Sequence, residues 1–140
     1  MMNDIIVGIS TALYKEFGDE YEIYQEEIRQ GLKEPCFFIQ CIEATVKPFR
    51  GERYFCSNVF CIQYFPTGNT NMECNSVFER MAYCLEYIDA SGDKMRGTKI
   101  RRELVDGVLN FFINYDCFVY RKNTPTETME ALCVEIKEKG

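Results

Sequence analysis

Residues 104–120 have the sequence LVDGVLNFFINYDCFVY, and this stretch decides the fold class. Asp106-Gly107 stands between apolar neighbours, which is a strong hairpin signal because glycine accepts the positive φ of a type I′ turn. Beyond the turn, large apolar residues recur at every second position, as in a strand with one buried face. That face carries Leu109, Phe111, Ile113, Tyr115, Cys117 and Val119, and the opposite face carries Asn110, Asn114 and Asp116. The last third of the chain is therefore predicted to contain an antiparallel hairpin, with Lys94–Val105 as its first, basic strand or arm.

Two further strands are predicted earlier in the chain, at residues 36–47 and 53–65, where aromatic and β-branched residues are frequent. Pro48-Phe49-Arg50-Gly51 separates them, so we expect a long hairpin. The second of these strands is apolar on both faces, which requires cover on both sides. Helices would cover one side, and a neighbouring subunit is a candidate for the other. Tyr21–Gln25 is a short strand candidate.

Two helices are predicted from apolar residues at three- and four-residue spacing. The first spans residues 3–17 and ends at Gly18, which can adopt the left-handed conformation. The second begins after Thr70, which forms a capping box with Glu73, and continues to about Ile88. Ser91-Gly92-Asp93 is expected to end this second helix.

These elements predict one domain over residues 1–140, of the α+β class. We expect a mixed or antiparallel β-sheet with an N-terminal helix and a central helix packed on it. The content of 46 % apolar and 14 % aromatic residues is sufficient for a core. For residues 129–137 a final strand is favoured over a helix, although both patterns fit.

The net charge of −6 argues against binding to nucleic acid or to an anionic membrane, since both are contacted through Lys and Arg. The first residues lack the basic start of a signal peptide, and no stretch approaches the roughly 20 apolar residues of a membrane span. We therefore expect a protein that is made and used in a cytosol.

The chain has no histidine, which removes the commonest general base and the commonest metal ligand. Among its eight cysteines, Cys36/Cys41 and Cys56/Cys61 are five apart within predicted strands, so the thiols of each pair point to opposite faces. Reduced core cysteines are the favoured interpretation, and a metal site or a disulfide is the alternative. We predict no catalytic, cofactor-binding or metal-binding residue, and no enzyme activity.

Charge is distributed unevenly along the chain. Residues 1–34 contain eight acids and three bases, whereas residues 94–102 contain five bases. Such a chain can bind a copy of itself head to tail, and heterologous contacts of this kind close into rings. A solvated edge strand protected by its charges explains the basic segment equally well. The candidate residues for an interface with another subunit or protein are Lys94, Arg96, Lys99, Arg101, Arg102, Arg50 and Arg53.

Three segments, together with Tyr64-Phe65-Pro66, carry a resemblance to a known family: Asn3-Asp4-Ile5-Ile6, residues 30–39 (QGLKEPCFFI) and residues 105–111 (VDGVLNF). The chain resembles the small tail terminator proteins of phages and of defective, PBSX-like prophages. The resemblance implies a tail-terminator-like fold, in which a mixed sheet is flanked by helices. It supplies no active site, so no residue roles are carried over.

The resemblance also implies a function. Tail terminators form a ring, usually a hexamer, on the head-proximal end of the tail tube, stop tube polymerisation and offer a surface for joining the head. The implied partners are other copies of the chain, the tube protein, and sheath and head-completion proteins. The implied location is a virion or phage-tail-like particle assembled in the bacterial cytoplasm. A head-tail connector or neck subunit and a small acidic secretion-type chaperone are the alternatives.

Overall fold

The computed structural model describes residues 2–25, 31, 33–68 and 71–120. In chain order its elements are α1 (Met2–Phe17), β1 (Glu22–Tyr24), β2 (Cys36–Pro48), β3 (Arg53–Phe65), α2 (Asn71–Leu85), β4 (Tyr87–Ala90), β5 (Asp93–Val105) and β6 (Val108–Tyr120). The strand or helix expected at residues 129–137 lies outside the described residues.

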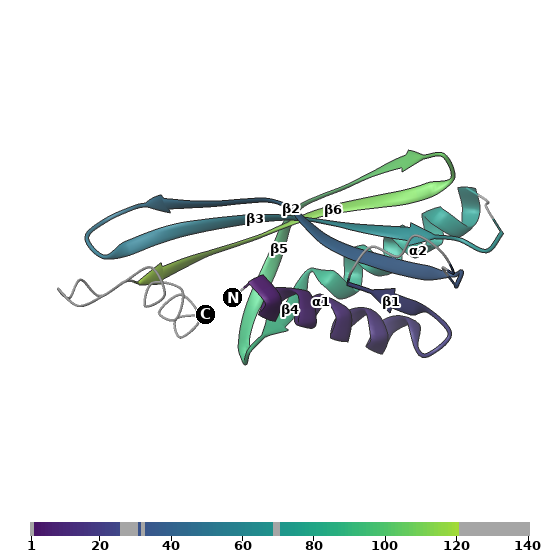
Figure 1. Cartoon of the computed structure of the whole chain (residues 1–140), viewed down its shortest axis with the longest axis horizontal. Coiled ribbons are helices and arrows are strands. Elements are labelled where there is room, and N and C mark those ends of the chain that lie inside the picture. The colour runs from purple at the N-terminus through teal and green to yellow at the C-terminus, as the bar shows by residue number, and fades with distance from the viewer. Residues whose placement is uncertain (1, 26–30, 32, 69–70, 121–140) are drawn as a thin grey trace.

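The six strands form one sheet in the order β1-β2-β3-β6-β5-β4 (Figure 1). β1 runs parallel to β2, and all other neighbouring strands are antiparallel. The two predicted hairpins, β2–β3 and β5–β6, are both present and join along β3 and β6. Asp106 and Gly107 have φ values of 51° and 78°, as the predicted type I′ turn requires. The α+β class and the mixed sheet are thus confirmed.

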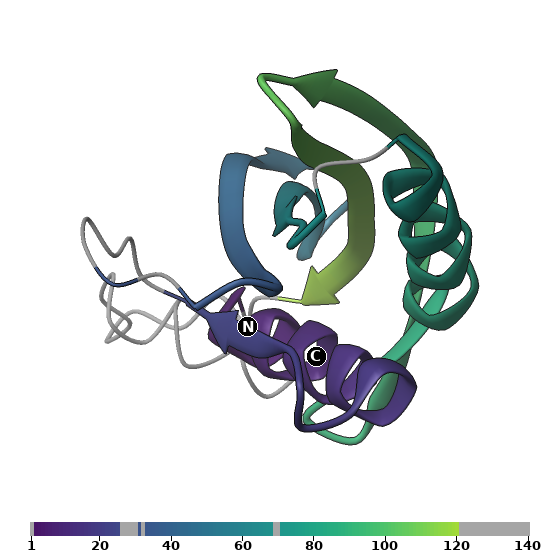
Figure 2. The same cartoon turned by 90° about the vertical axis from the view of Figure 1, so that its right-hand side faces the viewer.

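Both helices pack on the same face of the sheet, and they meet near their C-terminal ends at an angle (Figure 2). The helices contribute Ile5, Ile9, Leu13 and Phe17 from α1, and Cys74, Val77, Met81 and Leu85 from α2. The sheet contributes Phe37, Ile39, Phe60, Ile62, Tyr64, Leu109, Phe111, Ile113 and Tyr115. The apolar stripes predicted for the two helices are therefore the stripes that form the core.

The start of α2 follows the prediction. Glu73 is the third helical residue, and its carboxylate accepts hydrogen bonds from the backbone N–H groups of Thr67 (3.3 Å) and Gly68 (3.2 Å). The Tyr64 hydroxyl donates a further hydrogen bond of 2.6 Å to the same carboxylate. Thr70, the predicted partner in the capping box, lies outside the described residues. Glu73 therefore fixes the β3–α2 connection to the sheet.

The predicted end of α2 is wrong. The helix ends at Leu85 and not at Ile88, because the Gly97 N–H donates a 2.6 Å hydrogen bond to the Glu86 carbonyl. Tyr87–Ala90 then forms β4, paired with the start of β5. Ser91 and Gly92 have φ values of 54° and 89°, so they form a second hairpin turn and not a helix stop.

The sheet face opposite the helices is not covered by any described element. Its large apolar side chains, which include Phe55, Val59, Phe65 and Phe112, are only half-buried. In addition, the β2–β3 hairpin and the end of β6 project beyond both helices (Figure 1). This second face was expected to need another layer of protein packed on it, and the described residues provide no such layer.

Candidate interaction surfaces

The seven candidate basic residues lie in two places. Five of them are exposed on β5, namely Lys94, Arg96, Lys99, Arg101 and Arg102. The other two, Arg50 and Arg53, lie at the turn of the β2–β3 hairpin, where Arg53 pairs with Tyr120 of β6, whereas β5 pairs with β6 only between Val108 and Tyr115. The structure thus divides the predicted interface into two separate surfaces.

The C-terminal half of β5 forms a free strand edge. β4 pairs with β5 only through Asp93–Arg96, and Gly97 bonds to Glu86, so within the described residues the outer edge of β5 has no strand partner from Thr98 onward. A bulge between Thr98 and Arg101 places Lys99 at a φ of 53°. Bulges and charges are the devices by which natural edge strands avoid indiscriminate pairing.

Two arginines flank this free edge, one on each face of the sheet. The Arg101 guanidinium lies 4.0 Å from the ring centroid of Phe112, on the face without helices. The Arg102 guanidinium lies 5.5 Å from the ring centroid of Phe78 on α2. These rings hold both side chains beside the edge while the charges stay exposed. We call Lys99, Arg101 and Arg102 the basic edge.

Arg96 is less available to a partner than these residues. It forms an ion pair with Glu86 (3.3 Å) and lies over the ring of Tyr87 at 5.8 Å. Glu86 lies between α2 and β4, and Tyr87 is the first residue of β4, so Arg96 ties this part of the chain to β5. Exposed ion pairs contribute only about 0–1 kcal/mol, and Arg96 therefore has a minor structural role.

The turn of the β2–β3 hairpin carries a cluster that sequence analysis missed. The Arg53 guanidinium lies over the rings of Phe118 (4.7 Å), Phe49 (5.4 Å) and Tyr120 (5.8 Å). Phe55 also packs on Phe118, with 5.1 Å between the ring centroids. We call these five residues the arginine–aromatic cluster. Two features of the sequence could have indicated this cluster. Phe49 lies in a turn, and Phe118 lies on the polar face of its strand, and at neither position can a large apolar side chain enter the core.

The cluster is exposed although it is aromatic. The exposed fractions are 55 % for Phe49, 43 % for Phe118 and 45 % for Tyr120. Within the described residues, the buried Nε of Arg53 has no hydrogen-bond partner. Contiguous exposed aromatic rings around an arginine are typical of protein interfaces.

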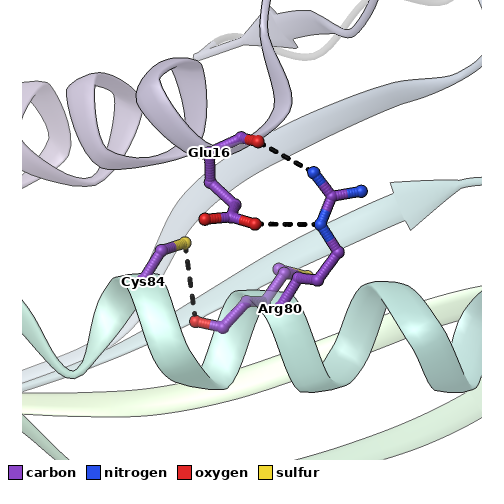
Figure 3. A network of polar contacts seen from close by, with 4 residues as sticks. Glu16, Arg80 and Cys84 are labelled. Atoms are coloured by element: carbon purple, nitrogen blue, oxygen red, sulfur yellow. Dashed lines mark hydrogen bonds and ion pairs between the residues drawn. The ribbon is translucent and has the colours of Figure 1, made fainter.

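The predicted acidic N-terminal region also divides into separate parts. Asp19, Glu20, Glu22 and Glu34 are exposed around β1, and we call them the acidic edge. Glu16 does not belong to this surface, because Arg80 donates hydrogen bonds to its carboxylate (2.9 Å) and to its backbone carbonyl (2.8 Å) (Figure 3). Glu26 and Glu27 lie outside the described residues.

The cysteines lie mainly in the interior. Cys36, Cys56, Cys61 and Cys74 are buried, and Cys41, Cys84 and Cys117 are partly buried. Burial raises the pKa of the Cys36 and Cys61 thiols to about 11 and that of Cys84 to about 12. These thiols are protonated at neutral pH, which makes them poor nucleophiles and poor metal ligands. In the ranges that the structure describes, no three Cys, Asp or Glu side chains gather as a metal site would require.

Neither α1 nor α2 is both long and apolar enough to cross a membrane. The candidate surfaces of the described residues are the two charged edges, the arginine–aromatic cluster and the uncovered face of the sheet.

A family model for phage tail terminator proteins matches residues 4–127, which is most of the chain. The chain belongs to the phage tail terminator family. This match confirms the resemblance to tail terminators that residues 3–6, 30–39 and 105–111 carry. The matched range contains the acidic edge, the basic edge and the arginine–aromatic cluster. No curated protein matches the chain.

Membership of the tail terminator family establishes the chain as a structural protein of the phage tail and hence as a component of the virion. The family is not a known class of enzymes. The surfaces that matter in a tail terminator are those that contact other proteins.

Proposed function

We propose that this tail terminator forms a closed ring of identical subunits, six as the resemblance implies, on the head-proximal end of the tail tube. The ring stops polymerisation of the tube and offers its outer surface to head-completion proteins and, in a contractile tail, to the last sheath ring. Assembly takes place in the cytoplasm of the host bacterium. The observation that carries this proposal is the family match over residues 4–127.

The open surfaces of the fold support a function in assembly. A subunit of a ring needs two different surfaces that contact its two neighbours, and a cap needs a third surface for the tube. The chain offers two charged edges at opposite sides of its sheet, and a separate arginine–aromatic cluster at the tip of the β2–β3 hairpin.

We assign the contact with the tube to the arginine–aromatic cluster. Arginine and aromatic residues are enriched among the side chains that dominate binding free energies. The hairpin that carries the cluster projects beyond the helices, so it can reach a partner without displacing either helix (Figure 1).

The test is electron microscopy of tubes polymerised with and without the purified protein. Tubes capped at one end by a ring, and shorter tubes as the protein concentration rises, would support the proposal. A protein that binds head or neck proteins while leaving the length and ends of the tubes unchanged would instead be a connector subunit. A protein that stays monomeric and binds no tube would refute the proposal.

A further inference from the structure

The two charged edges lie on opposite sides of one sheet. β1, which carries Glu22, is the first strand in the sheet order, and the basic residues lie on β5 across three intervening strands (Figure 1). At a strand spacing of about 4.8 Å, the path from β1 to β5 along the curled sheet is about 19 Å (Figure 2). One copy of the chain can therefore contact two neighbours at once, one through each edge.

The register places the two edges at nearly the same height along the strands. β1 pairs with Cys36–Phe38. The residues paired across the sheet from there are Tyr64 on β3, Leu109 on β6 and Leu104 on β5. Arg101 and Arg102 lie only two to three residues from Leu104, which corresponds to about 10 Å or less. A neighbour related by rotation about an axis along the strands would thus bring one edge against the other.

The charges of both edges are available to a neighbour. The acidic edge has four exposed carboxylates, and among the described residues of the same segment Lys33 is an exposed base. The basic edge has three exposed bases and one exposed acid nearby, Glu103. Within the described residues, the ion pairs formed are Arg80–Glu16 and Arg96–Glu86, and neither includes a residue of the two edges.

The side chains of the basic edge are also held in place before a partner arrives. Arg101 lies on Phe112 and Arg102 on Phe78, so part of the side-chain entropy that binding would cost is already lost in the free subunit. An arginine held by a ring keeps its guanidinium donors for a carboxylate on another molecule.

We propose that the partner of the basic edge is the acidic edge of a second copy of this chain. Lys99, Arg101 and Arg102 of one subunit face Asp19, Glu20, Glu22 and Glu34 of the next, and repetition of this head-to-tail contact closes the ring. The inference rests on the proposed ring and names the two surfaces through which neighbouring subunits of that ring contact each other. Opposite charge on the two edges also prevents two like edges from pairing, and this fixes the direction of assembly.

The test uses two charge-reversal variants of the full chain. The first, Arg101→Glu/Arg102→Glu, makes both edges acidic, and the second, Glu20→Lys/Glu22→Lys/Glu34→Lys, makes both edges basic. Each variant alone brings like charges together in every contact, so we expect self-association to weaken more than about 100-fold at low salt. Sedimentation velocity and native mass spectrometry give the assembly state, and circular dichroism checks that each variant is folded.

An equimolar mixture of the two variants supplies the decisive result. An acidic subunit then meets a basic subunit at every contact, so rings should reappear with strictly alternating subunits and an even number of them. The matched control is Lys15→Glu/Lys47→Glu, which changes the net charge by the same amount as Arg101→Glu/Arg102→Glu, at exposed positions outside both edges, and should form rings alone. If Arg101→Glu/Arg102→Glu does not fold, Lys99→Glu/Arg101→Glu replaces it.

The outcomes separate this inference from the proposed function. A parent protein that forms no ring and caps no tube refutes the proposed function itself. If the parent forms rings and each reversal variant also does so with parental stability, the inference about the edges is wrong. It is also wrong if each folded variant fails alone and the mixture fails as well, because the two edges then do not meet each other.

Discussion

The hydroxyl of Tyr115 donates a hydrogen bond of 2.6 Å to the backbone carbonyl of Leu85. Tyr115 is fully buried in the middle of β6, and Leu85 is the last residue of α2. The C-terminal end of a helix leaves carbonyls without intrahelical partners, so this bond satisfies one of them inside the core. It connects the helix layer to the sheet at the point where the chain turns into β4.

We expect Tyr115→Phe to lower the free energy of unfolding by about 1–3 kcal/mol, because the Leu85 carbonyl would remain buried without its partner. Thermal or urea unfolding followed by circular dichroism measures the change. Tyr83→Phe is the matched control, since Tyr83 lies on α2 with 83 % of its surface exposed. Equal stability of the two variants would show that the hydroxyl contributes nothing.

A second prediction concerns Gly97, where β5 passes close to the end of α2. A Cβ at this position would collide with Cδ1 of Ile113 and lie 3.1 Å from the Leu85 carbonyl oxygen. We expect Gly97→Ala to destabilise the fold by about 1–3 kcal/mol through overpacking.

Removing the clashing methyl group should restore part of this loss. Ile113→Val deletes Cδ1, so Gly97→Ala/Ile113→Val should be more stable than the sum of the two single changes predicts. Strict additivity in this double-mutant cycle would mean that Ile113 is not the obstacle. Thr98→Ala, at the exposed neighbouring position, is the control for the substitution itself.

The raised pKa values of the buried thiols predict how the stability of the fold depends on alkaline pH. The pKa of Cys36 and Cys61 is raised by burial to about 11 in the folded chain, against an ordinary value of 9.0. Between these values the unfolded chain releases protons that the folded chain retains. Stability is therefore complete below about pH 9 and falls as pH rises toward about 11. The buried hydroxyls of Tyr64 and Tyr115, whose pKa values are raised by burial, act in the same direction.

Melting temperatures measured in steps from neutral pH to about pH 11 test this window. Cys84→Ala removes a thiol whose pKa is raised to about 12, so the variant should lose less stability over the same range than the parent does. A melting temperature that does not change with alkaline pH would contradict the prediction.

The arginine–aromatic cluster predicts a defect in tube capping with little change in folding. Phe49→Ser/Phe118→Ser removes two exposed rings, and interface aromatic residues at the centre of a contact typically contribute about 2 kcal/mol or more each to binding. Rings should still form, while capping of the tube should require much more protein. Tyr83→Ser removes an even more exposed ring on α2 and should cap normally. Normal capping by the double variant would show that the tube binds elsewhere.

Local patterns in the sequence were sufficient for most of the fold. The alternation after Asp106-Gly107 predicted β6 and its hairpin, and the stripe from Ile5 to Phe17 predicted α1. Both are decided by short-range periodicity and turn chemistry, which a single sequence contains. The reduced state of the cysteines stays a prediction, although their burial agrees with it in large part.

The errors arose where tertiary contacts override local preference. The apolar stripe of α2 continues through Leu85 to Ile88, but hydrogen bonds from β5 and β6 to Glu86 and Leu85 end the helix earlier. Ser91-Gly92 was interpreted as a helix stop because β4 has only four residues and little pattern of its own. The arginine–aromatic cluster joins Phe49 to Phe118, and one sequence does not show which strands are neighbours.

The pairing of β3 with β6 affects the order in which the parts of the sheet form during folding. β2–β3 and β5–β6 are local hairpins that close in microseconds, whereas the pairing of Asn58 with Tyr115 brings together residues 57 positions apart. The loop between β3 and β6 contains α2, β4 and β5, so its closure has the larger entropic cost. Formation of the β3–β6 ladder is therefore expected to limit the folding rate, and until it forms each hairpin exposes an unpaired edge to other nascent chains.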